Sequence, residues 1–317
     1  MKTPFRIVFM GTPGFAVASL EALIADDSIE VAAVVTVADK PAGRGQKLSE
    51  SEVKRCALRH NLPILQPVKL RDDDFLAELK SYNADLFVVV AFRMLPEVVW
   101  NMPPKGSINL HGSLLPDYRG AAPIHHAVIN GEKETGCTTF FLTHAIDTGA
   151  IIDQCRIRIG DNETTGEVHD RMMAEGAKLL RSTVLKIAQG NVEAMPQDDL
   201  LKGRHPKEAP KLNREMARID WNAGVQEVHN HIRGLSPFPG AHTELNEEAV
   251  KLYSGKIAAV SYGDAAPGSI VQNREGVFVA CGDKRWYSVE SLQMPGKKRL
   301  DVVSFIAGNS IDGLRFM

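Results

Sequence analysis

The stretch IVFMGTPGFA, residues 7–16, decides the fold of the first part of the chain. Its leading apolar residues predict a buried strand, the GTPG segment predicts a turn, and the apolar residues from Phe15 to Ile24 recur at helical spacing. A second apolar run, Val31–Val37, follows within the ~30 residues that a strand-helix-strand unit needs, and Leu86–Phe92 supplies a third. The pattern predicts an α/β domain with a mainly parallel sheet covered by helices, and functional residues at the carboxyl ends of its strands.

The glycine turn after the first strand has two interpretations. Residues 11–16 lack the GxGxxG spacing of a dinucleotide-binding loop, which argues against a nucleotide-dependent oxidoreductase. In the simpler interpretation, a glycine there only lets the strand meet the following helix at close range. We expect the simpler interpretation to hold.

The hydrophobic pattern of the remaining sequence changes twice. Apolar residues at helical spacing predict a long helix over Glu167–Ile187, and the polar stretch Gln189–Ala209, which has no periodicity, predicts a linker. Short apolar runs separated by Gly, Asn and Asp turns then predict a small OB-like β-barrel, with strands at Val250–Tyr253, Ile257–Val260, Ser269–Val271, Val277–Ala280 and Trp286–Val289. We therefore expect a first domain over residues 1–190, a linker over 191–209 and a smaller second domain over 210–317.

Composition narrows the class of protein. The chain has 317 residues, 44% of them hydrophobic, and a net charge of −2, so any contact with RNA must come from local patches. Its four cysteines have no CxxC spacing, which argues against a zinc site or a disulfide framework and indicates buried free thiols in a reducing compartment. No signal peptide and no apolar run of membrane-spanning length is present, so we expect a cytoplasmic protein.

Three polar residues form the candidate site. Asn109 and His111 are two residues apart at the end of a short apolar run, so in an extended backbone both side chains point to the same face. Asp147 comes from a separate segment after a second strand-like run, Cys137–Leu142, and suits a group that orients the imidazole. The Asp-Thr-Gly triplet is equally compatible with an Asx-type turn that needs no chemistry.

The loop after His111 carries further polar groups. Ser113–Pro116 predicts a rigid, apolar turn that holds those groups at the end of the strand, where they can bind an oxyanion. Arg119 suits a substrate carboxylate or phosphate, or a structural ion pair, and the sequence leaves both open. His125, His126 and His144 lack the spacing and the carboxylate partners of a metal site, so we predict no metal.

Two basic segments are candidates for contact with RNA. The flexible loop Asp39–Lys47 suits a solvated connector and a phosphate-binding loop equally well. Lys297–Arg299 is the most concentrated positive turn of the second domain, and Lys207 and Lys211 precede that domain. Solvated surface charge is the alternative for each of these residues, whereas together they are able to follow the phosphates of a tRNA.

Several of these segments resemble one family. NLHGSLLPDYRGAAPIHHAVINGEKETGCT at residues 109–138, with DTG at 147–149, closely resembles the tetrahydrofolate-dependent formyltransferases. Matches over both domains narrow the resemblance to members that act on methionyl-tRNA: MGTPGFA at 10–16, KPAGRG at 40–45, SLLPDYRGAAP at 113–123 and ARIDW at 217–221.

The resemblance implies a Rossmann-like formyltransferase domain and an OB-like tRNA-binding domain. It implies transfer of the formyl group of 10-formyltetrahydrofolate, a co-substrate, to initiator methionyl-tRNA, giving N-formylmethionyl-tRNA for translation initiation without a metal, a membrane or an obligate protein partner. The implied catalytic residues are Asn109, His111 and Asp147. The implied folate-binding residues are Phe92, Leu95, Ser113, Leu114, Leu115 and Pro116. The candidate tRNA-binding residues are Lys40, Arg44, Lys47, Lys207, Lys211, Lys297, Lys298 and Arg299.

The sequence departs from the family pattern in two places. Phe92-Arg93-Met94 stands where relatives commonly carry Tyr-Gly and one further residue, which affects the shape of the folate pocket. Glu50 and Glu52 stand where relatives usually carry prolines, which changes the charge and stiffness of the chain after the basic loop.

Other functions compete with this one. Formyltransferases that act on glycinamide ribonucleotide or on an amino sugar share the site, but the former usually lack a second domain of this size. An RNA-binding protein with a degenerate enzyme domain is a further alternative, against which the intact Asn109, His111 and Asp147 argue.

Overall fold

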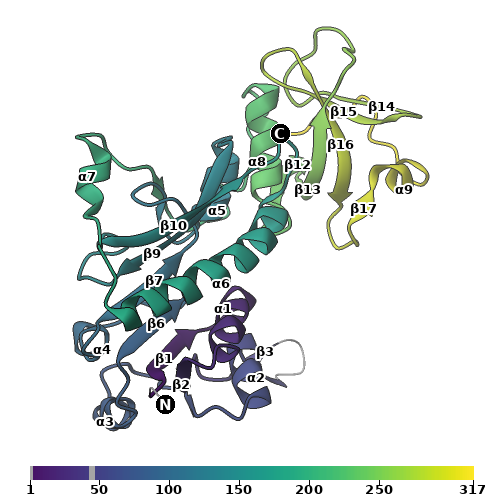
Figure 1. Cartoon of the computed structure of the whole chain (residues 1–317). Helices are drawn as coiled ribbons and strands as arrows, with labels where there is room; N and C mark the ends of the chain where they lie inside the picture. The colour runs from purple at the N-terminus through teal and green to yellow at the C-terminus, as the bar shows by residue number, and fades with distance from the viewer. Residues whose placement is uncertain (1–2, 43–46) are drawn as a thin grey trace. The chain divides into compact units, whose positions relative to one another are not determined.

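The computed structural model describes residues 3–42 and 47–317, which form two compact units interleaved along the chain (Figure 1). The first unit consists of Met1–Arg119, Gly136–Ile157 and Asp170–Glu208. The second consists of Gly120–Thr135, Arg158–His169 and Ala209–Met317. All three residues of the candidate site belong to the first unit.

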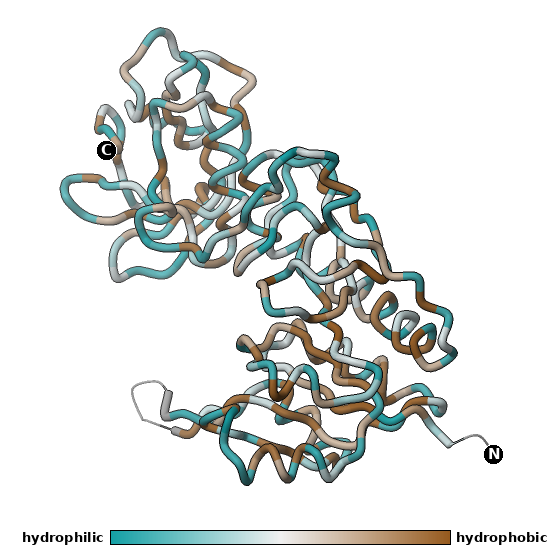
Figure 2. Tube along the Cα trace, turned by 90° about the vertical axis from the view of Figure 1, so that its left-hand side faces the viewer, coloured by the Kyte–Doolittle hydropathy of each residue, from teal (hydrophilic) through white to brown (hydrophobic). Residues whose placement is uncertain are grey.

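A seven-stranded, mainly parallel sheet forms the centre of the first unit, as predicted. Its order is β10-β9-β7-β6-β1-β2-β5, in which β5, β2, β1, β6 and β7 run parallel and β9 is antiparallel to β7. Figure 2 shows hydrophobic stretches, in brown, running through the part of the chain near the N-terminus. The strands are β1 (Phe5–Gly11), β2 (Ile29–Val35), β5 (Ile64–Leu65), β6 (Leu86–Val90), β7 (Ser107–His111), β9 (Glu134–Phe141) and β10 (Ile151–Arg158).

Gly11 lets β1 meet the helix that follows it. A Cβ atom at this position would lie 2.8 Å from the Cβ of Ala16 in α1 (Gly14–Ile24) and 3.0 Å from the carbonyl oxygen of Val90. Since no side chain fits there, the simpler interpretation of the glycine turn is confirmed.

Helices pack on the sheet of the first unit (Figure 1). The predicted long helix is α6 (Thr165–Gln189), where a Cβ at Gly176 would lie 3.0 Å from Cys137 Sγ of β9, so the helix lies close on the sheet. The other helices are α2 (Glu52–Arg59), α3 (Asp73–Ser81), α4 (Glu97–Trp100) and α7 (Gln197–Leu201).

The basic loop and the glutamates after it have structural roles in the described residues. Short strands β3 (Lys40–Ala42) and β4 (Lys47–Ser49) pair at its base, while Arg44 lies outside the described residues. Ser51 then caps α2 by accepting a hydrogen bond from the Lys54 N–H at 3.0 Å. Glu50 forms an ion pair with the Lys54 side chain at 3.0 Å. Glu52, one of the two glutamates that depart from the family pattern, is therefore the first residue of α2.

An antiparallel sheet of short strands dominates the second unit, which confirms that prediction; its OB-like closure stays a prediction. The expected strand Ile257–Val260 is wrong, because its first residue is the last of β13. The strands are β12 (Ala241–Leu245), β13 (Glu248–Ile257), β14 (Ile270–Asn273), β15 (Gly276–Ala280), β16 (Trp286–Gln293) and β17 (Leu300–Asp301). The helices are α5 (Pro123–Ile129), α8 (Val225–Gly234) and α9 (Val302–Ile306).

The ARIDW segment belongs to the core of the second unit. Ala217, Ile219 and Trp221 are all buried there, and the Trp221 ring stacks on Phe316 with 5.7 Å between ring centroids. The Trp221 indole also donates to Thr243 Oγ1 at 2.9 Å. The three apolar residues of the motif therefore hold this segment in the core of the second unit. Their packing explains why they are apolar without a direct role in chemistry.

Residues 191–209, expected to be a linker, contain secondary structure. They include α7 and β11 (Glu208–Ala209), which pairs with β8 (Arg119–Gly120). Met195 exchanges two backbone hydrogen bonds of 2.8 Å with Ile151. Most of this segment is thus attached to the first unit.

The four cysteines are free thiols, as expected; Cys56, Cys137 and Cys281 are buried and Cys155 is half-buried. Among the helices of residues 3–42 and 47–317, none combines the length and the apolar character needed to cross a membrane.

Candidate active site

Asn109 and His111 lie at the carboxyl end of β7, as predicted. Pairing places Asn109 between Val89 of β6 and Phe140 of β9, and His111 opposite Thr138. Because side chains two residues apart in a strand share a face, the amide and the imidazole emerge on the same side of the sheet.

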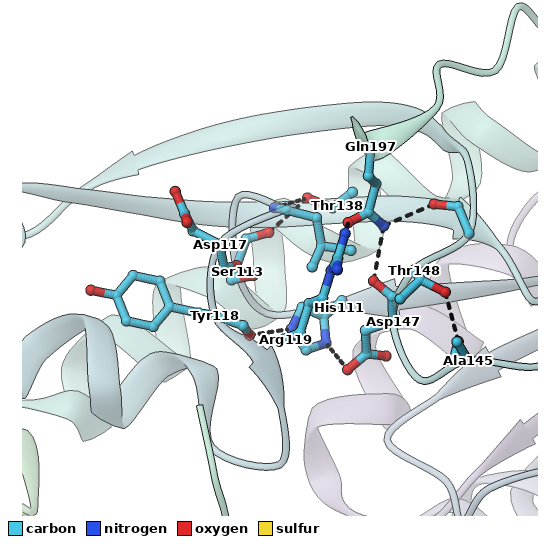
Figure 3. A network of polar contacts seen from close by, with 12 residues as sticks. His111, Ser113, Asp117, Tyr118, Arg119, Thr138, Ala145, Asp147, Thr148 and Gln197 are labelled. Atoms are coloured by element: carbon cyan, nitrogen blue, oxygen red, sulfur yellow. Dashed lines mark hydrogen bonds and ion pairs between the residues drawn. The ribbon is translucent and has the colours of Figure 1, made fainter. Parts of the chain in front are cut away.

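Two oxygen atoms flank the His111 ring, and one of them accepts a hydrogen bond from it (Figure 3). Its Nε2 lies 2.8 Å from the carbonyl oxygen of Tyr118, and its Nδ1 lies 3.7 Å from Asp147 Oδ2. A carbonyl oxygen only accepts, so Nε2 carries a proton, and Nδ1 is the nitrogen that faces the carboxylate. His111 is only 7% exposed and Asp147 only 11%, so this arrangement is largely shielded from solvent. The structure thus brings His111 and Asp147 together, and their catalytic roles stay a prediction.

A network of hydrogen bonds fixes the loop that carries the Tyr118 carbonyl. Ser113 Oγ donates to the carbonyl oxygen of Asp117 at 2.7 Å, and Thr138 Oγ1 donates to that of Ser113 at 2.7 Å. The Leu115 N–H donates to Thr138 Oγ1 at 3.1 Å. Ser113, Leu115 and Pro116 are buried within the loop, so they shape it, whereas their contact with a folate stays a prediction.

The Asn109 side chain has an unsatisfied oxygen. Its Oδ1 is buried and makes no hydrogen bond within the described residues. Leaving a buried polar atom unpaired costs about 1–3 kcal/mol, so such atoms are uncommon in a core that serves only stability. An amide of this kind beside His111 is suited to a ligand that offers a hydrogen-bond partner. Because the terminal torsion of an amide side chain is soft, a turn of the Asn109 amide would bring its nitrogen to the place of the unpaired oxygen.

Asp147 occupies a tight turn between β9 and β10. Its φ is 54°, in the left-handed region that a non-glycine residue occupies at a cost of about 1 kcal/mol. A Cβ on Gly149 would lie 1.6 Å from the Phe141 carbonyl oxygen, so only glycine lets the turn close against β9. The Asp-Thr-Gly triplet thus combines a carboxylate that faces His111 with a backbone that needs the glycine.

Gln197 was not predicted from the sequence, yet its side chain contacts both the turn that carries Asp147 and Arg119, which follows Tyr118 (Figure 3). Its Nε2 donates to the carbonyl oxygens of Asp147 and Gly149, at 2.9 and 2.8 Å. Its Oε1 accepts from Arg119 Nε and Nη2, at 3.0 and 2.6 Å. Since two of its partners are backbone atoms, no motif in the sequence could have indicated them. Arg119, for which a substrate or an ion pair was expected, uses its guanidinium to bind this amide.

Two of the residues expected to bind folate, Phe92 and Leu95, lie in a loop that also exposes an apolar side chain. Leu95 is buried in the core beside the half-buried Phe92, whereas Met94 is 74% exposed and Ile146 63% exposed. His144 packs edge-on against Trp100 of α4, with 5.3 Å between the ring centroids, so the loop before Asp147 lies next to this helix. Exposed apolar side chains in these neighbouring loops fit a flat aromatic ligand.

Arg93, the departure from the family pattern, joins two loops. Its guanidinium donates to the carbonyl oxygens of Pro67 and, at 3.0 Å, Val68. Burial of this group lowers the pKa of Arg93 from its usual value. The arginine therefore shapes the loop after β6.

The histidines considered as metal ligands contact other groups. His125 and His126 lie within hydrogen-bond distance of the carbonyl oxygens of Phe238 and Pro210, at 3.1 and 2.9 Å. Burial lowers the pKa of His125, although the contact with the Phe238 carbonyl opposes this shift. His144 lies 3.4 Å from a carboxylate oxygen of Glu97.

One group of possible metal ligands lies elsewhere in the described residues, where donor atoms of Glu21, Cys56 and His60 are within 4.8 Å of one another. The Glu21 carboxylate there is paired with Arg59 at 2.9 Å.

The candidate tRNA-binding residues are distributed over both units. Lys40 and Lys207 are exposed in the first unit, where the Lys207 ammonium lies 5.7 Å from the Tyr118 ring centroid. Lys211 and Lys297–Arg299 are exposed in the second. Arg299 also packs over the Tyr253 ring at 4.5 Å and donates to Ser291 Oγ at 2.7 Å. The backbone of Lys47 is in β4, and Arg44 is outside the described residues.

Comparison with known proteins assigns the family. A formyl transferase model matches residues 5–184, and a model of the formyl transferase C-terminal domain matches residues 211–310. The methionyl-tRNA formyltransferase of Bacteroides fragilis is 50% identical over 313 residues, covering 97% of this chain and 96% of the relative. That of Flavobacterium johnsoniae is 48% identical over 307 residues, covering 96% of each.

Among solved structures, the sugar 3N-formyl transferase WlaRD shares the fold, with a TM-score of 0.66 at 20% identity over 94% of this chain and 100% of that one. The chain therefore belongs to the formyltransferase family, and within it to the methionyl-tRNA formyltransferases.

Proposed function

We propose that this protein transfers the formyl group of 10-formyltetrahydrofolate to the amino group of initiator methionyl-tRNA, giving N-formylmethionyl-tRNA for translation initiation in the cytoplasm. The first unit, to which residues 191–208 belong, would carry the chemistry, and the second unit, which includes residues 210–317, would bind tRNA. The observation that carries the proposal is the unsatisfied Asn109 amide beside a His111 ring that is held between Tyr118 and Asp147. The near-full-length likeness to methionyl-tRNA formyltransferases supports the choice of substrate.

The folate supplies an electrophilic formyl carbon when it is bound. The exposed apolar side chains of Met94 and Ile146 would pack on its ring system, and the unpaired Asn109 Oδ1 marks a polar group that is left for such a ligand. We assign no metal to this chemistry.

Asn109 would stabilise charge in the reaction. Attack by an amine places negative charge on the formyl oxygen, and a positioned amide donor to such an oxygen is typically worth ~10²- to 10³-fold in rate. With its nitrogen turned to the substrate, Asn109 at the end of β7 is that donor. The rest of the barrier lowering would come from holding the amine and the formyl group together.

His111, oriented by Asp147, would take up the proton that the attacking amine loses. As the bond between the amine and the formyl carbon forms and the bond from that carbon to N10 of the folate breaks, the amine loses a proton and N10 gains one. His111 Nδ1, the ring nitrogen that carries no proton, would pass the proton from one to the other, and such a group contributes ~10²- to 10⁴-fold. Asp147, 3.7 Å from Nδ1, is placed to hold the ring in orientation and to stabilise its protonated form.

The decisive experiment is a formylation assay with purified protein and 10-formyltetrahydrofolate. Charged initiator methionyl-tRNA, uncharged tRNA, glycinamide ribonucleotide and an amino sugar nucleotide are the acceptors. We expect transfer to the charged initiator tRNA alone. Transfer to one of the small amines instead would overturn the tRNA substrate but keep the site, and transfer to none would overturn the proposed function.

A further inference from the structure

The side chain of Gln197 is fully engaged. It is 2% exposed at the first position of α7, and each of its hydrogen-bonding positions has a partner: two donated bonds to carbonyl oxygens and two accepted from Arg119. A reversed amide would set N–H groups against the guanidinium and an oxygen against two carbonyl oxygens. The partners therefore fix the orientation of this amide.

The first pair of bonds acts on the turn that presents Asp147. One of the two carbonyl oxygens belongs to Asp147 itself, the residue in the left-handed conformation, and the other to Gly149. Met195, two residues before Gln197, pairs through its backbone with Ile151, two residues after Gly149, and so holds the segment of Gln197 against the start of β10. The turn is thus held by the Gln197 side chain and, next to it, by the Met195–Ile151 backbone pair.

The second pair of bonds acts on the other side of the histidine. Arg119 directly follows Tyr118, whose carbonyl oxygen accepts the His111 Nε2–H. A single amide therefore connects the two chain segments that flank the imidazole, one providing the carboxylate and the other the carbonyl (Figure 3).

We propose that Gln197 is a positioning residue, which acts through the Asp147 turn and Arg119 to set the distance between the Asp147 carboxylate and His111. The inference rests on the proposed function, because its consequence is a rate. At metal sites, removing a group that orients a ligand without touching substrate typically lowers activity 10- to 100-fold, and we expect an effect of that size here. A small displacement of the carboxylate is enough for such a loss.

The test uses the full-length protein and two substitutions. Gln197→Met keeps the length of the side chain but removes all four hydrogen bonds. Gln197→Glu keeps the acceptor for Arg119 but sets a carboxylate oxygen against the two carbonyl oxygens, so it isolates the contact with the turn. Asp199→Asn, an exposed change in the same helix, is the matched control.

Each substitution is assayed for formylation of methionyl-tRNA in the wild-type and the Asp147→Asn background. We expect Gln197→Met to lower kcat about 10- to 100-fold with the KM for folate within about threefold, and Gln197→Glu to do nearly the same. In the Asp147→Asn background we expect Gln197→Met to cost less than about threefold, because its effect acts through the missing carboxylate. Equal fold losses in both backgrounds would overturn the inference, since that is the result of a general loss of structure.

Amide hydrogen exchange provides a readout that needs no activity. We expect peptides covering residues 143–151 to exchange faster in Gln197→Met than in the wild type, and those of β1 and β2 to stay unchanged. Unchanged exchange at 143–151 would contradict the inference whatever the substrate. An inactive wild type with faster exchange in the variant would instead reject the proposed function and retain Gln197 as the residue that holds the Asp147 turn.

Discussion

At the residue scale, Asn109 and His111 differ in whether their polar side-chain atoms have partners within the protein. The imidazole is held between a carbonyl oxygen and a carboxylate, whereas the amide oxygen beside it has no hydrogen-bond partner within the described residues. Because an unpaired buried polar atom is unfavourable, Asn109 contributes less to stability than an apolar residue of its size would. A side chain kept in such a place is explained by what it does for a ligand.

The substitution Asn109→Ala tests this difference. It should lower kcat for formylation about 10²- to 10³-fold, while the KM for folate changes by less than about threefold, because a donor to the oxyanion acts in the transition state. The free energy of unfolding, measured by urea denaturation, should fall by no more than ~1 kcal/mol. Asn191→Ala, an exposed change after α6, is the control. A loss that appears only in KM would show that Asn109 binds substrate rather than stabilises charge.

At the element scale, the sequence predicted those elements whose residues are apolar and regular. The runs around Ile7, Val31 and Leu86 became central strands because a parallel sheet buries both of its faces, and β7 placed Asn109 and His111 on one face as their spacing required. Residues 191–209 are polar and aperiodic, so their sequence predicts a linker. Their structure comes from single contacts: the Met195 backbone pairing, the Gln197 amide and an ion pair at Arg204. Such contacts leave no periodic signal.

The Arg204–Asp117 ion pair is one of these contacts, and its contribution should depend on pH. Arg204 donates to both carboxylate oxygens, at 2.6 and 2.7 Å. Burial acts to raise the pKa of Asp117, but the hydrogen bonds from Arg204 and the Lys207 N–H outweigh it, so the pKa lies below its usual value. A lowered carboxyl pKa gives stability that is present above the unfolded value of about 3.9 and is lost as pH falls through the folded value.

We therefore expect Arg204→Ala to lower the free energy of unfolding by ~1 kcal/mol at pH 7, a modest value because both side chains are partly exposed. The difference from the wild type should shrink at pH 3. Urea denaturation at the two pH values measures it. Lys178→Ala, which removes the exposed pair with Glu175, should cost less than ~0.5 kcal/mol at either. Equal destabilisation by Arg204→Ala at pH 7 and pH 3 would mean that packing, not charge, is lost.

At the scale of the whole molecule, charge has to act locally. The net charge is −2, so attraction to RNA phosphates has to come from clusters such as Lys297–Arg299 rather than from the chain as a whole. These three residues are not equivalent. Arg299 packs on Tyr253 and bonds to Ser291, so its replacement would disturb the fold, whereas Lys297 and Lys298 are exposed side chains at the turn before β17. The two lysines are the appropriate positions for a test of tRNA binding.

Neutralising both lysines in Lys297→Ala/Lys298→Ala should weaken binding of methionyl-tRNA and reduce the slope of log K against log salt by ~1.5, since each phosphate contact adds roughly 0.7 to 0.9 to that slope. Turnover at saturating tRNA should stay within about twofold of the wild type, because neither side chain belongs to the site of Asn109, His111 and Asp147. Binding is measured by filter retention over 50 to about 300 mM salt. The double variant Lys69→Ala/Arg71→Ala, which neutralises two exposed cations outside the predicted set, controls for net charge. If both double variants change the slope equally, long-range charge explains the effect, and an unchanged slope in the first would remove Lys297 and Lys298 from the tRNA footprint.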